Sequence, residues 1–303
     1  MSASTISRLV PRAASVSFRG VALALALVWT VWGSTYLAMR VAVSALPPWG
    51  MAGTRFLVAG AILLAVSRVR GEAWPSRRAW SVAVPTGFLL FFVGNGFVAV
   101  AEQSIPSGLA AVVCATTPLV SSVMSAFRGD KPSRAEIVGM VLGFAGVAVL
   151  AVGSPLSGGG WPAVMLLFSP VGFAAGSLLA RKSTGGPFST TATHMLAGGA
   201  LMVCASFVRG ERMPDVVATP AIFAWLYLVV LGSVITFSAY AWLLRNARTS
   251  LAMSHAYVNP LVAVLLGAIV SGESLGVVTI VSAVLIASGV IVALRLGSRR
   301  SAA

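Results

Sequence analysis

The chain reads SGLAAVVCATTPLV over residues 107–120 and TSLAMSHAYVNPLV over residues 249–262. The two stretches keep the same order of small, polar and apolar residues, and they place Pro118 and Pro260 at matching positions. Similarity at a fixed spacing indicates an internal repeat. This repeat decides the fold, because it predicts that one structural unit is built twice within 303 residues.

Further matches extend the repeat on both sides. Downstream, Gly146-Val147-Ala148-Val149 corresponds to Gly289-Val290-Ile291-Val292, and upstream Thr54-Arg55-Phe56-Leu57 corresponds to Thr193-His194-Met195-Leu196. We therefore expect two copies of one unit. The expected organisation is a basic tail at residues 1–19, a first repeat at 20–152, a linker at 153–161, a second repeat at 162–296 and a tail at 297–303.

The composition excludes a water-soluble protein. Hydrophobic residues make up 58% of the chain and charged residues only 9%, whereas soluble domains carry about 25% charged residues. So few charges cannot cover the surface of a soluble globule, and so many apolar residues exclude a disordered chain. We expect a polytopic membrane protein.

Long runs without charge locate the membrane spans. The run at 137–180 is too long for one span, and it breaks at the Gly-, Ser- and Pro-rich residues 153–160. One further span, at 41–67, is interrupted only by Arg55. The sequence thus predicts an all-α membrane protein with ten transmembrane helices, five in each repeat. The remaining charge-free runs lie at residues 20–39, 79–101, 103–127, 183–208, 216–244, 249–272 and 274–294.

Five is an odd number, so the second repeat enters the membrane from the opposite side. Inverted repeats of this kind are typical of secondary transporters that work by alternating access; a channel is the alternative. No HExxH or GxxxxGK[ST] motif is present, so we expect no catalytic centre, metal site, cofactor or ATP drive. The expected partners are the lipid bilayer and a small-molecule substrate, with a monomer and a homodimer both open.

Basic residues predict the orientation, because short cytoplasmic loops are enriched in Lys and Arg. With the N-terminus inside, only Arg40, Arg209 and Arg212 fall in outer loops, and Arg55 lies within a helix. Both termini are therefore expected in the cytoplasm. The net charge of +14 is explained by this orientation, so no nucleic-acid partner is expected.

Several motifs resemble a known family. They are the runs Trp32-Gly33-Ser34-Thr35-Tyr36, Gly53-Thr54-Arg55-Phe56, Gly94-Asn95-Gly96 and Ala101-Glu102-Gln103. Together they resemble the EamA family of the drug/metabolite transporter superfamily, and most closely its YedA-type branch. The resemblance extends from residue 20 to 294. It implies two inverted five-helix repeats around a central cavity, and export of amino acids, other metabolites or toxic compounds across the bacterial inner membrane.

Arg55 is the first candidate for substrate binding. An arginine inside a membrane span is costly unless it is paired or hydrated, so it is expected to face the interior and to mark a pathway. Its guanidinium can hold a substrate carboxylate through two hydrogen bonds. The alternative is a structural ion pair with Glu102, which is expected near the same outer face.

Three other ionisable residues are candidates for proton coupling. His194 occupies the repeat position of Arg55, and His255 lies in the ninth predicted helix. Each can relay a proton, or can be a neutral core histidine bonded to a hydroxyl such as that of Thr190. Glu102 can be a coupling carboxylate, or can cap the helix that follows it.

Aromatic residues predict a cavity wall. Trp29, Trp32 and Tyr36 follow the spacing i, i+3, i+7, which places them on one face of the first helix. Tyr240 is expected to join them from the eighth helix. The alternative is contact with lipid or the membrane interface.

Polar residues and prolines complete the set of candidates. The Asn95 amide requires a hydrogen-bond partner, from a substrate or from a neighbouring helix, and Tyr257 and Asn259 follow His255 in the ninth helix. Pro118 and Pro260 predict paired hinges, because a proline frees a carbonyl and allows a kink. The function expected from all these features is secondary export of small metabolites, amino acids first. The alternative is efflux of lipophilic drugs or toxic cations. Proton exchange and facilitated diffusion both remain open.

Overall fold

The computed structural model describes residues 17–105, 107–127, 129, 132–151, 160–271 and 277–297. Of the expected tails and linker, only residues 17–19, 160, 161 and 297 fall in these ranges. Every regular element within the described ranges is a helix.

The elements of the first half follow the predicted spans in order. They are α2 (Phe18–Val43), α3 (Pro48–Val69), α4 (Arg77–Gly87), the π-helix η1 (Phe88–Gly96), α5 (Phe97–Ala101), α6 (Ser107–Cys114), α7 (Thr117–Ala126) and α8 (Arg134–Ala151). The second half has a parallel series. It consists of α9 (Trp161–Ala180), α10 (Pro187–Val208), α11 (Thr219–Tyr227), the π-helix η2 (Leu228–Ile235), α12 (Thr236–Asn246), α13 (Thr249–Ala252), α14 (His255–Ser271) and α15 (Val277–Gly297).

Six helical segments among the described residues are long and apolar enough to cross a membrane. This confirms that the described residues form helices with multiple candidate spans, while the count of ten spans stays a prediction. A shorter apolar helical stretch, formed by parts of α6 and α7, covers Ala110–Ala126. Helices α8, α14 and α15 occupy the other predicted segments. The six segments are Phe18–Val43, Pro48–Val69, Arg77–Ala101, Trp161–Ala180, Pro187–Val208 and Thr219–Asn246.

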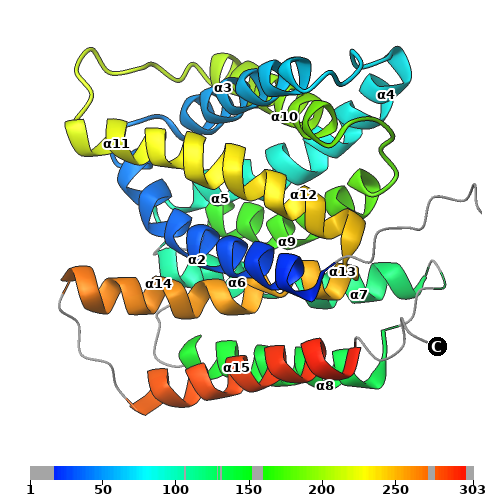
Figure 1. Cartoon of the computed structure of the whole chain (residues 1–303). Coiled ribbons are helices and arrows are strands. Elements are labelled where there is room, and N and C mark those ends of the chain that lie inside the picture. The colour runs from blue at the N-terminus through cyan, green and yellow to red at the C-terminus, as the bar shows by residue number, and fades with distance from the viewer. Residues whose placement is uncertain are drawn as a thin grey trace, which may run out of the picture.

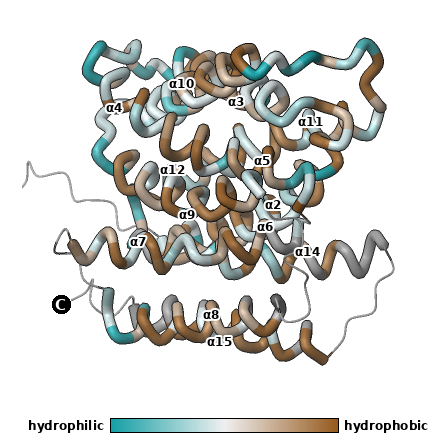
Figure 2. Tube along the Cα trace, turned by 180° about the vertical axis from the view of Figure 1, so that it is seen from behind, coloured by the Kyte–Doolittle hydropathy of each residue, from teal (hydrophilic) through white to brown (hydrophobic). Residues whose placement is uncertain are grey.

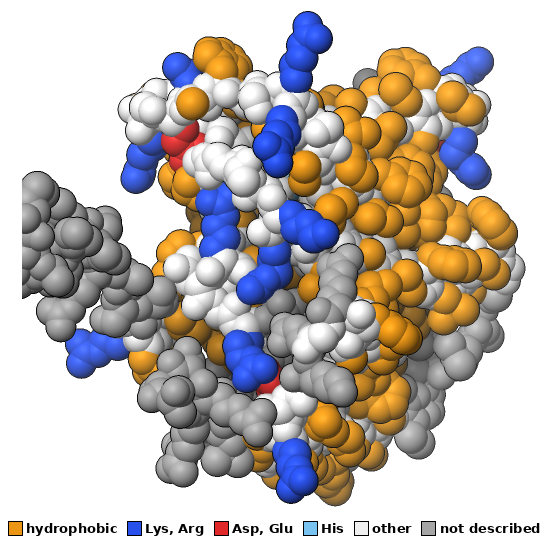
Figure 3. All heavy atoms as spheres, turned by 90° about the vertical axis from the view of Figure 1, so that its right-hand side faces the viewer, with side chains coloured by type: hydrophobic (Ala, Val, Ile, Leu, Met, Phe, Trp, Pro, Cys, Tyr) orange, Lys and Arg blue, Asp and Glu red, His pale blue; other side chains and the backbone are white. Residues whose placement is uncertain are grey.

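The outside of the helical body is apolar. Figure 2 shows hydrophobic helix along the body and hydrophilic segments toward its edges. Large apolar side chains such as Phe127, Leu167 and Phe223 are exposed by 89%, 64% and 67%. A continuous hydrophobic band covers part of the face in Figure 3. A surface of this kind suits hydrocarbon as the surrounding solvent, because the helices satisfy their own backbone hydrogen bonds.

The two halves pack on each other in a reciprocal pattern. The second helix of one half pairs with that of the other (α3 with α10), and the last helices pair in the same way (α8 with α15). Figure 1 shows the first pair at one edge of the body and the second pair at the opposite edge. Between these pairs, α2 packs on α12 and α14, and α9 packs on η1 and α7. Each first helix therefore contacts the other half.

Helices α3 and α10 run antiparallel, and each carries a glutamate that caps its partner. The Glu72 carboxylate, just after α3, accepts hydrogen bonds from the first turn of α10, the shorter being 2.8 Å from the Ser189 N–H. The Glu211 carboxylate, just after α10, accepts from the first turn of α3, the shorter being 2.9 Å from the Gly50 N–H. A carboxylate is stabilising at the positive end of a helix. The exchange is the arrangement expected of halves with opposite orientation.

A repeated sequence builds both caps. The run Val69-Arg70-Gly71-Glu72 returns as Val208-Arg209-Gly210-Glu211. The glycines have φ of +72° and +68°, a left-handed conformation that glycine adopts without strain. In each copy the glutamate N–H donates to a carbonyl near the helix end, Ser67 at 2.9 Å and Ser206 at 3.0 Å. These turns end the helices and place both carboxylates.

Removing either cap is expected to destabilise the protein by a similar amount. Glu72→Ala and Glu211→Ala should each lower the free energy of unfolding by about 1 kcal/mol, as for other N-terminal caps. The two losses should add in the double variant, because a 22-residue helix spans about 33 Å and distant sites act independently. Thermal unfolding of the purified protein in detergent measures this. Glu72→Gln, which keeps an acceptor oxygen, is the control. A double variant that is as stable as a single variant would contradict reciprocal capping.

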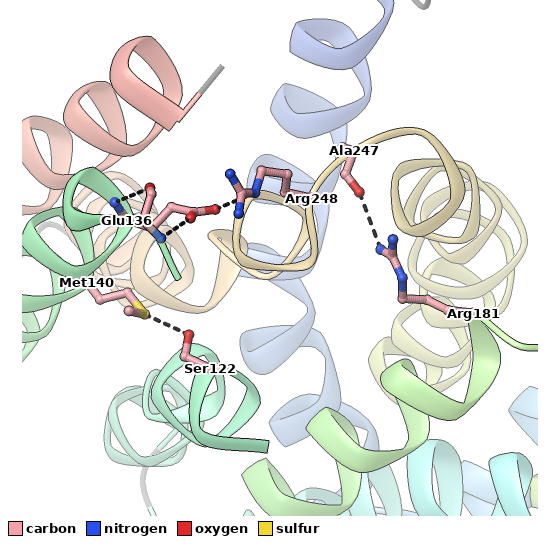
Figure 4. A network of polar contacts seen from close by, with 7 residues as sticks. Ser122, Glu136, Met140, Arg181, Ala247 and Arg248 are labelled. Atoms are coloured by element: carbon pink, nitrogen blue, oxygen red, sulfur yellow. Dashed lines mark hydrogen bonds and ion pairs between the residues drawn. The ribbon is translucent and has the colours of Figure 1, made fainter. Parts of the chain in front are cut away.

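Polar contacts also join the halves near the start of α8 (Figure 4). The Glu136 carboxylate forms an ion pair with Arg248, which precedes α13, at 3.0 Å between Nε and Oε1. Its other oxygen accepts a hydrogen bond from the Ser133 N–H at 2.8 Å. Within the second half, Arg181, after α9, donates to the Ala247 carbonyl at 3.3 Å. The ends of α9 and α12 and the start of α8 are therefore linked.

Candidate functional site

A partly open cavity lies between the two halves. Its volume is about 60 Å³, enough for several water molecules at the ~10–15 Å³ that each requires. Helices of both halves contribute to its wall. The lining residues are Trp32, Thr35, Tyr36, Met39, Arg55, Gly94, Asn95, Val98, Cys114, Thr117, Ser169, Phe173, His255, Ala256 and Asn259.

The two copies of the repeated stretch line the cavity at matching positions. Cys114 and Ala256 occupy one repeat position, and Thr117 and Asn259 occupy another. Among the described residues, α6 ends at Cys114 before α7 begins, and α13 ends before α14 begins at His255. Interrupted helices from both halves thus meet at the cavity.

The π-helix η1 contributes Gly94 and Asn95 to the wall. The Asn95 amide donates to the Leu90 carbonyl, five residues earlier, at 2.9 Å. The wide π turn leaves the Gly94 carbonyl to accept a hydrogen bond from Ser169 Oγ on α9 at 2.6 Å. The amide nitrogen of Asn95 therefore has a partner within its own helix, and Asn95 also lines the cavity, so a substrate partner stays a prediction. π turns are frequent at functional sites.

The π-helix η2 plays the corresponding part in the second half. Ser233 Oγ donates to the Leu228 carbonyl, again five residues earlier, at 2.9 Å. The Gly232 carbonyl accepts from Trp32 Nε1 at 3.0 Å, and Ser233 Oγ accepts from Arg55 Nε at 2.7 Å. This π turn therefore fixes two residues of the cavity wall that come from the first half.

Arg55 is the cation of the cavity lining. Its side chain is only 2% exposed, and its guanidinium lies 4.7 Å from the centre of the Phe56 ring. Among the described residues, Nε is the guanidinium atom with a hydrogen-bond partner, the Ser233 hydroxyl. Within the described part of the chain, the residues that line the cavity include no carboxylate.

The expected direct ion pair between Arg55 and Glu102 is not formed. Glu102 is 1% exposed and interacts electrostatically with Arg40 and Arg55, yet neither of its carboxylate oxygens has a hydrogen-bond partner among the described residues. The same observation gives no support to the expected cap of the next helix. Arg40 instead donates to the Ile105 carbonyl at 2.9 Å. Arg55 instead donates to the Ser233 hydroxyl, and Glu102 acts on it electrostatically without direct contact.

An aromatic cluster surrounds Trp32. Its ring centre lies 4.6 Å from that of His255, 4.7 Å from Phe237, 5.0 Å from Tyr240 and 5.8 Å from Phe173. Edge-to-face contacts of this kind stabilise aromatic pairs. The cluster joins α2, α9, α12 and α14 and forms one side of the cavity.

Three of the aromatic residues expected at the cavity do not line it. Trp29 donates through Nε1 to Ser254 Oγ at 3.1 Å, at the break between α13 and α14. Tyr240 lies behind Trp32 and donates to Ser177 Oγ at 2.9 Å. Tyr257 packs against Gly143 of α8, one residue along from Ala256, so it points away from the cavity. Helical spacing placed these residues near the site without fixing the side that each presents.

The two histidines have different surroundings. His255 lines the cavity, whereas His194 lies outside the lining with its Nε2 3.1 Å from Ser183 Oγ. A hydroxyl partner for His194 was expected from the threonines of α10; it comes from the loop before that helix. Pro118 lies in the first turn of α7 and Pro260 lies inside α14. Whether they act as hinges stays a prediction.

Sequence reasoning missed part of the lining. Cys114 and Thr117 carry a usable signal, because they occupy the repeat positions of Ala256 and Asn259. Ser169 and Phe173 carry none, because their roles depend on the packing of α9 against η1 and α2. The remaining unforeseen residues are Thr35, Met39, Gly94, Val98 and Ala256.

Comparison with known proteins agrees with this architecture. Residues 19–152 and 160–295 match the model of the EamA-like transporter family. The chain is 42% identical over 254 residues to the uncharacterized inner membrane transporter YedA of Escherichia coli K12, covering 83% of each chain. It is 28% identical to the protein PecM of Dickeya dadantii, covering 86% of this chain and 88% of that one.

A solved crystal structure shares the fold. Its TM-score is 0.73 at 22% sequence identity, and the match covers 95% of this chain and 100% of that one. At this identity the likeness concerns the fold alone. The family match and the identity to YedA together establish that this chain is a multi-pass inner membrane protein and belongs to the EamA-like transporter family.

Proposed function

We propose that this protein is a secondary transporter that exports small metabolites carrying a carboxylate, amino acids first, by alternating access. The family supports a membrane transporter. The observation that carries the substrate class is Arg55, a buried guanidinium in the cavity wall that no carboxylate of the lining neutralises. A buried charge requires a compensating partner. A substrate carboxylate supplies one and fits the planar guanidinium through two hydrogen bonds.

The arrangement of the halves supports alternating access. In ten spans arranged as two inverted repeats, each helix of one half packs on the other half as its counterpart does in return. The reciprocal caps of Glu72 and Glu211 fit this symmetry. We assign Pro118 and Pro260 as paired hinges near the interrupted helices. Basic side chains gather on the face in Figure 3, on the side where α2 begins, which supports termini in the cytoplasm because cytoplasmic loops are enriched in Lys and Arg.

Proton coupling belongs to the same proposal. Glu102 is a buried carboxylate within electrostatic range of Arg55, so a proton on Glu102 and an anion at Arg55 influence each other. His255 is the second coupling candidate because it lines the cavity, and His194 is the third, on the inner side. Facilitated diffusion is the alternative, and an imposed proton gradient distinguishes the two.

A second function is favoured by the aromatic cluster. Trp32 and Phe173 offer ring surfaces that accept apolar or cationic compounds, which fits efflux of lipophilic drugs. Against this, Arg55 repels a cation that enters the same cavity. The two functions therefore predict opposite substrate charge.

Reconstituted protein separates these functions. Proteoliposomes preloaded with unlabelled compound should accumulate radiolabelled amino acids faster than empty liposomes do, and they should not accumulate the lipophilic cation tetraphenylphosphonium. Amino acids are tested one by one, with and without an imposed proton gradient. Accumulation of the cation alone would reject the carboxylate assignment and favour drug efflux.

A further inference from the structure

Two buried polar atoms of the cavity wall have no partner. Asn259 is 2% exposed and His255 5%, and both line the cavity. Among the described residues, neither Asn259 Oδ1 nor His255 Nε2 has a hydrogen-bond partner. Nearly all buried polar side-chain atoms in proteins are paired. An unpaired acceptor and an unpaired nitrogen on one helix of a cavity therefore point to a ligand.

The contact between the two residues defines what each offers. Asn259 Nδ2 lies 3.4 Å from His255 Nδ1. An amide nitrogen only donates, so Nδ1 accepts, and a neutral imidazole then carries its hydrogen on Nε2. The Asn259 side chain also interacts with the Tyr36 hydroxyl. Among the described residues the amide oxygen has no hydrogen-bond partner, so it is available as an acceptor.

The repeat shows that this acceptor is particular to the second half. Thr117 occupies the matching position in the first half, and its hydroxyl donates to the Cys114 carbonyl at 2.6 Å. The threonine is satisfied within its own half, whereas the asparagine is not. The packing of the fold therefore does not by itself demand an unpaired oxygen at this position.

Asn259 and Arg55 together present complementary groups to one ligand. Arg55 comes from α3 and offers donors to a carboxylate, while Asn259 comes from α14 and offers an acceptor. The Trp32 ring also lines the cavity, and its face can stabilise a nearby cation. A ligand that complements all three has a carboxylate at one end and an ammonium group beside it.

We infer that Asn259 is the subsite for the amino group of the substrate, and that it makes the cavity select α-amino acids over simple carboxylic acids. This inference rests on the proposed function, which assigns the carboxylate to Arg55. His255 is a positioning residue in this subsite, because its Nδ1 holds the Asn259 amide with the oxygen unengaged.

A pair of ligands that differ only in the amino group tests the subsite. Leucine and 4-methylpentanoate share the carboxylate and the side chain, and only leucine carries the ammonium group. Their dissociation constants are measured on the purified full chain from the rise in unfolding temperature as each is added. If another amino acid gives a larger flux, it and its deamino analogue replace this pair.

The wild type is expected to bind leucine at least tenfold more tightly than 4-methylpentanoate. Asn259→Leu should bring the two constants within about twofold, by weakening leucine while leaving 4-methylpentanoate nearly unchanged. Asn259→Thr, which copies the first half, should have the same effect and serves if the leucine variant does not fold. Asn246→Leu is the control, because the Asn246 amide donates to the Trp242 carbonyl outside the cavity, and it should keep the wild-type ratio.

The outcomes separate this inference from the proposed function. A wild type that binds both ligands equally, or a ratio unchanged in Asn259→Leu and Asn259→Thr, would overturn the amino-group subsite and leave the carboxylate site standing. A wild type that binds no carboxylate, but binds tetraphenylphosphonium, would overturn the proposed function itself. A tenfold ratio that disappears in both variants supports the subsite.

Discussion

Arg55→Ala is expected to abolish carboxylate transport while the protein remains folded. The guanidinium supplies the charge of the cavity wall, and each hydrogen bond to a charged group contributes about 1.5–3 kcal/mol. Loss of a two-bond contact should therefore weaken substrate binding by roughly 100-fold or more. The loss should appear for every amino acid alike, since all of them share the carboxylate. Counterflow into proteoliposomes measures this directly.

Two further variants distinguish a binding role from a structural one. Arg55→Lys keeps the charge but loses the planar guanidinium group that makes two hydrogen bonds to a carboxylate, so it should retain partial transport. Ser233→Ala removes the hydroxyl that holds Arg55 Nε and should cause a smaller loss than Arg55→Ala. If Arg55→Ala transports amino acids at the wild-type rate, Arg55 has no part in binding. If Arg55→Ala loses transport because the variant unfolds, as shown by a lowered unfolding temperature, Arg55 has a structural role.

Gly199→Val is expected to prevent folding. A Cβ at Gly199 would lie 2.9 Å from the Gly53 carbonyl oxygen and 2.9 Å from the Leu57 nitrogen of α3. These are backbone atoms, which cannot rotate away as a side chain can. The loss of stability should exceed the ~1–3 kcal/mol typical of overpacking, because the α3–α10 pair also carries Arg55 and both glutamate caps.

Gly20→Val provides the matched control for this substitution. Gly20 also lies in a helix, but a Cβ there would meet only the ring of Trp242 at 3.4 Å, which is an ordinary contact. The yield of monodisperse protein after detergent extraction should stay near wild type for Gly20→Val and fall close to zero for Gly199→Val. Equal yields would show that the close approach of α3 and α10 is not required.

The sequence predicted the large-scale features because they depend on strong, local patterns. Charge-free runs indicated the helices, and the stretch around Pro118 and its copy around Pro260 indicated two repeats. The same reasoning placed Trp32, Tyr36, Arg55, Asn95 and Asn259 near one cavity, since each is polar or aromatic within an otherwise apolar span. Their roles in substrate binding stay proposals.

The details that the sequence did not predict depend on packing between distant segments. The Arg-Gly-Glu run at 70–72 is repeated at 209–211 in the sequence. Its role as a cap follows only from the antiparallel contact of α3 with α10. The hydroxyl that holds Arg55 is 178 residues away, in a π turn for which no sequence rule gives the register.

The π-helices have a consequence for how such a site can diversify. A π turn holds one more residue than the α turn it replaces, so η1 and η2 each contain a tolerated insertion within a span. Deleting one residue from either segment would restore a regular α-helix, leave the flanking turns in place and change which side chains the turn presents. Asn95 would then leave the cavity wall, or Ser233 would leave Arg55, while the number of helices stayed the same. Length changes of a single residue, usually the most damaging events in a buried helix, become here a route to new cavity surfaces on an unchanged scaffold.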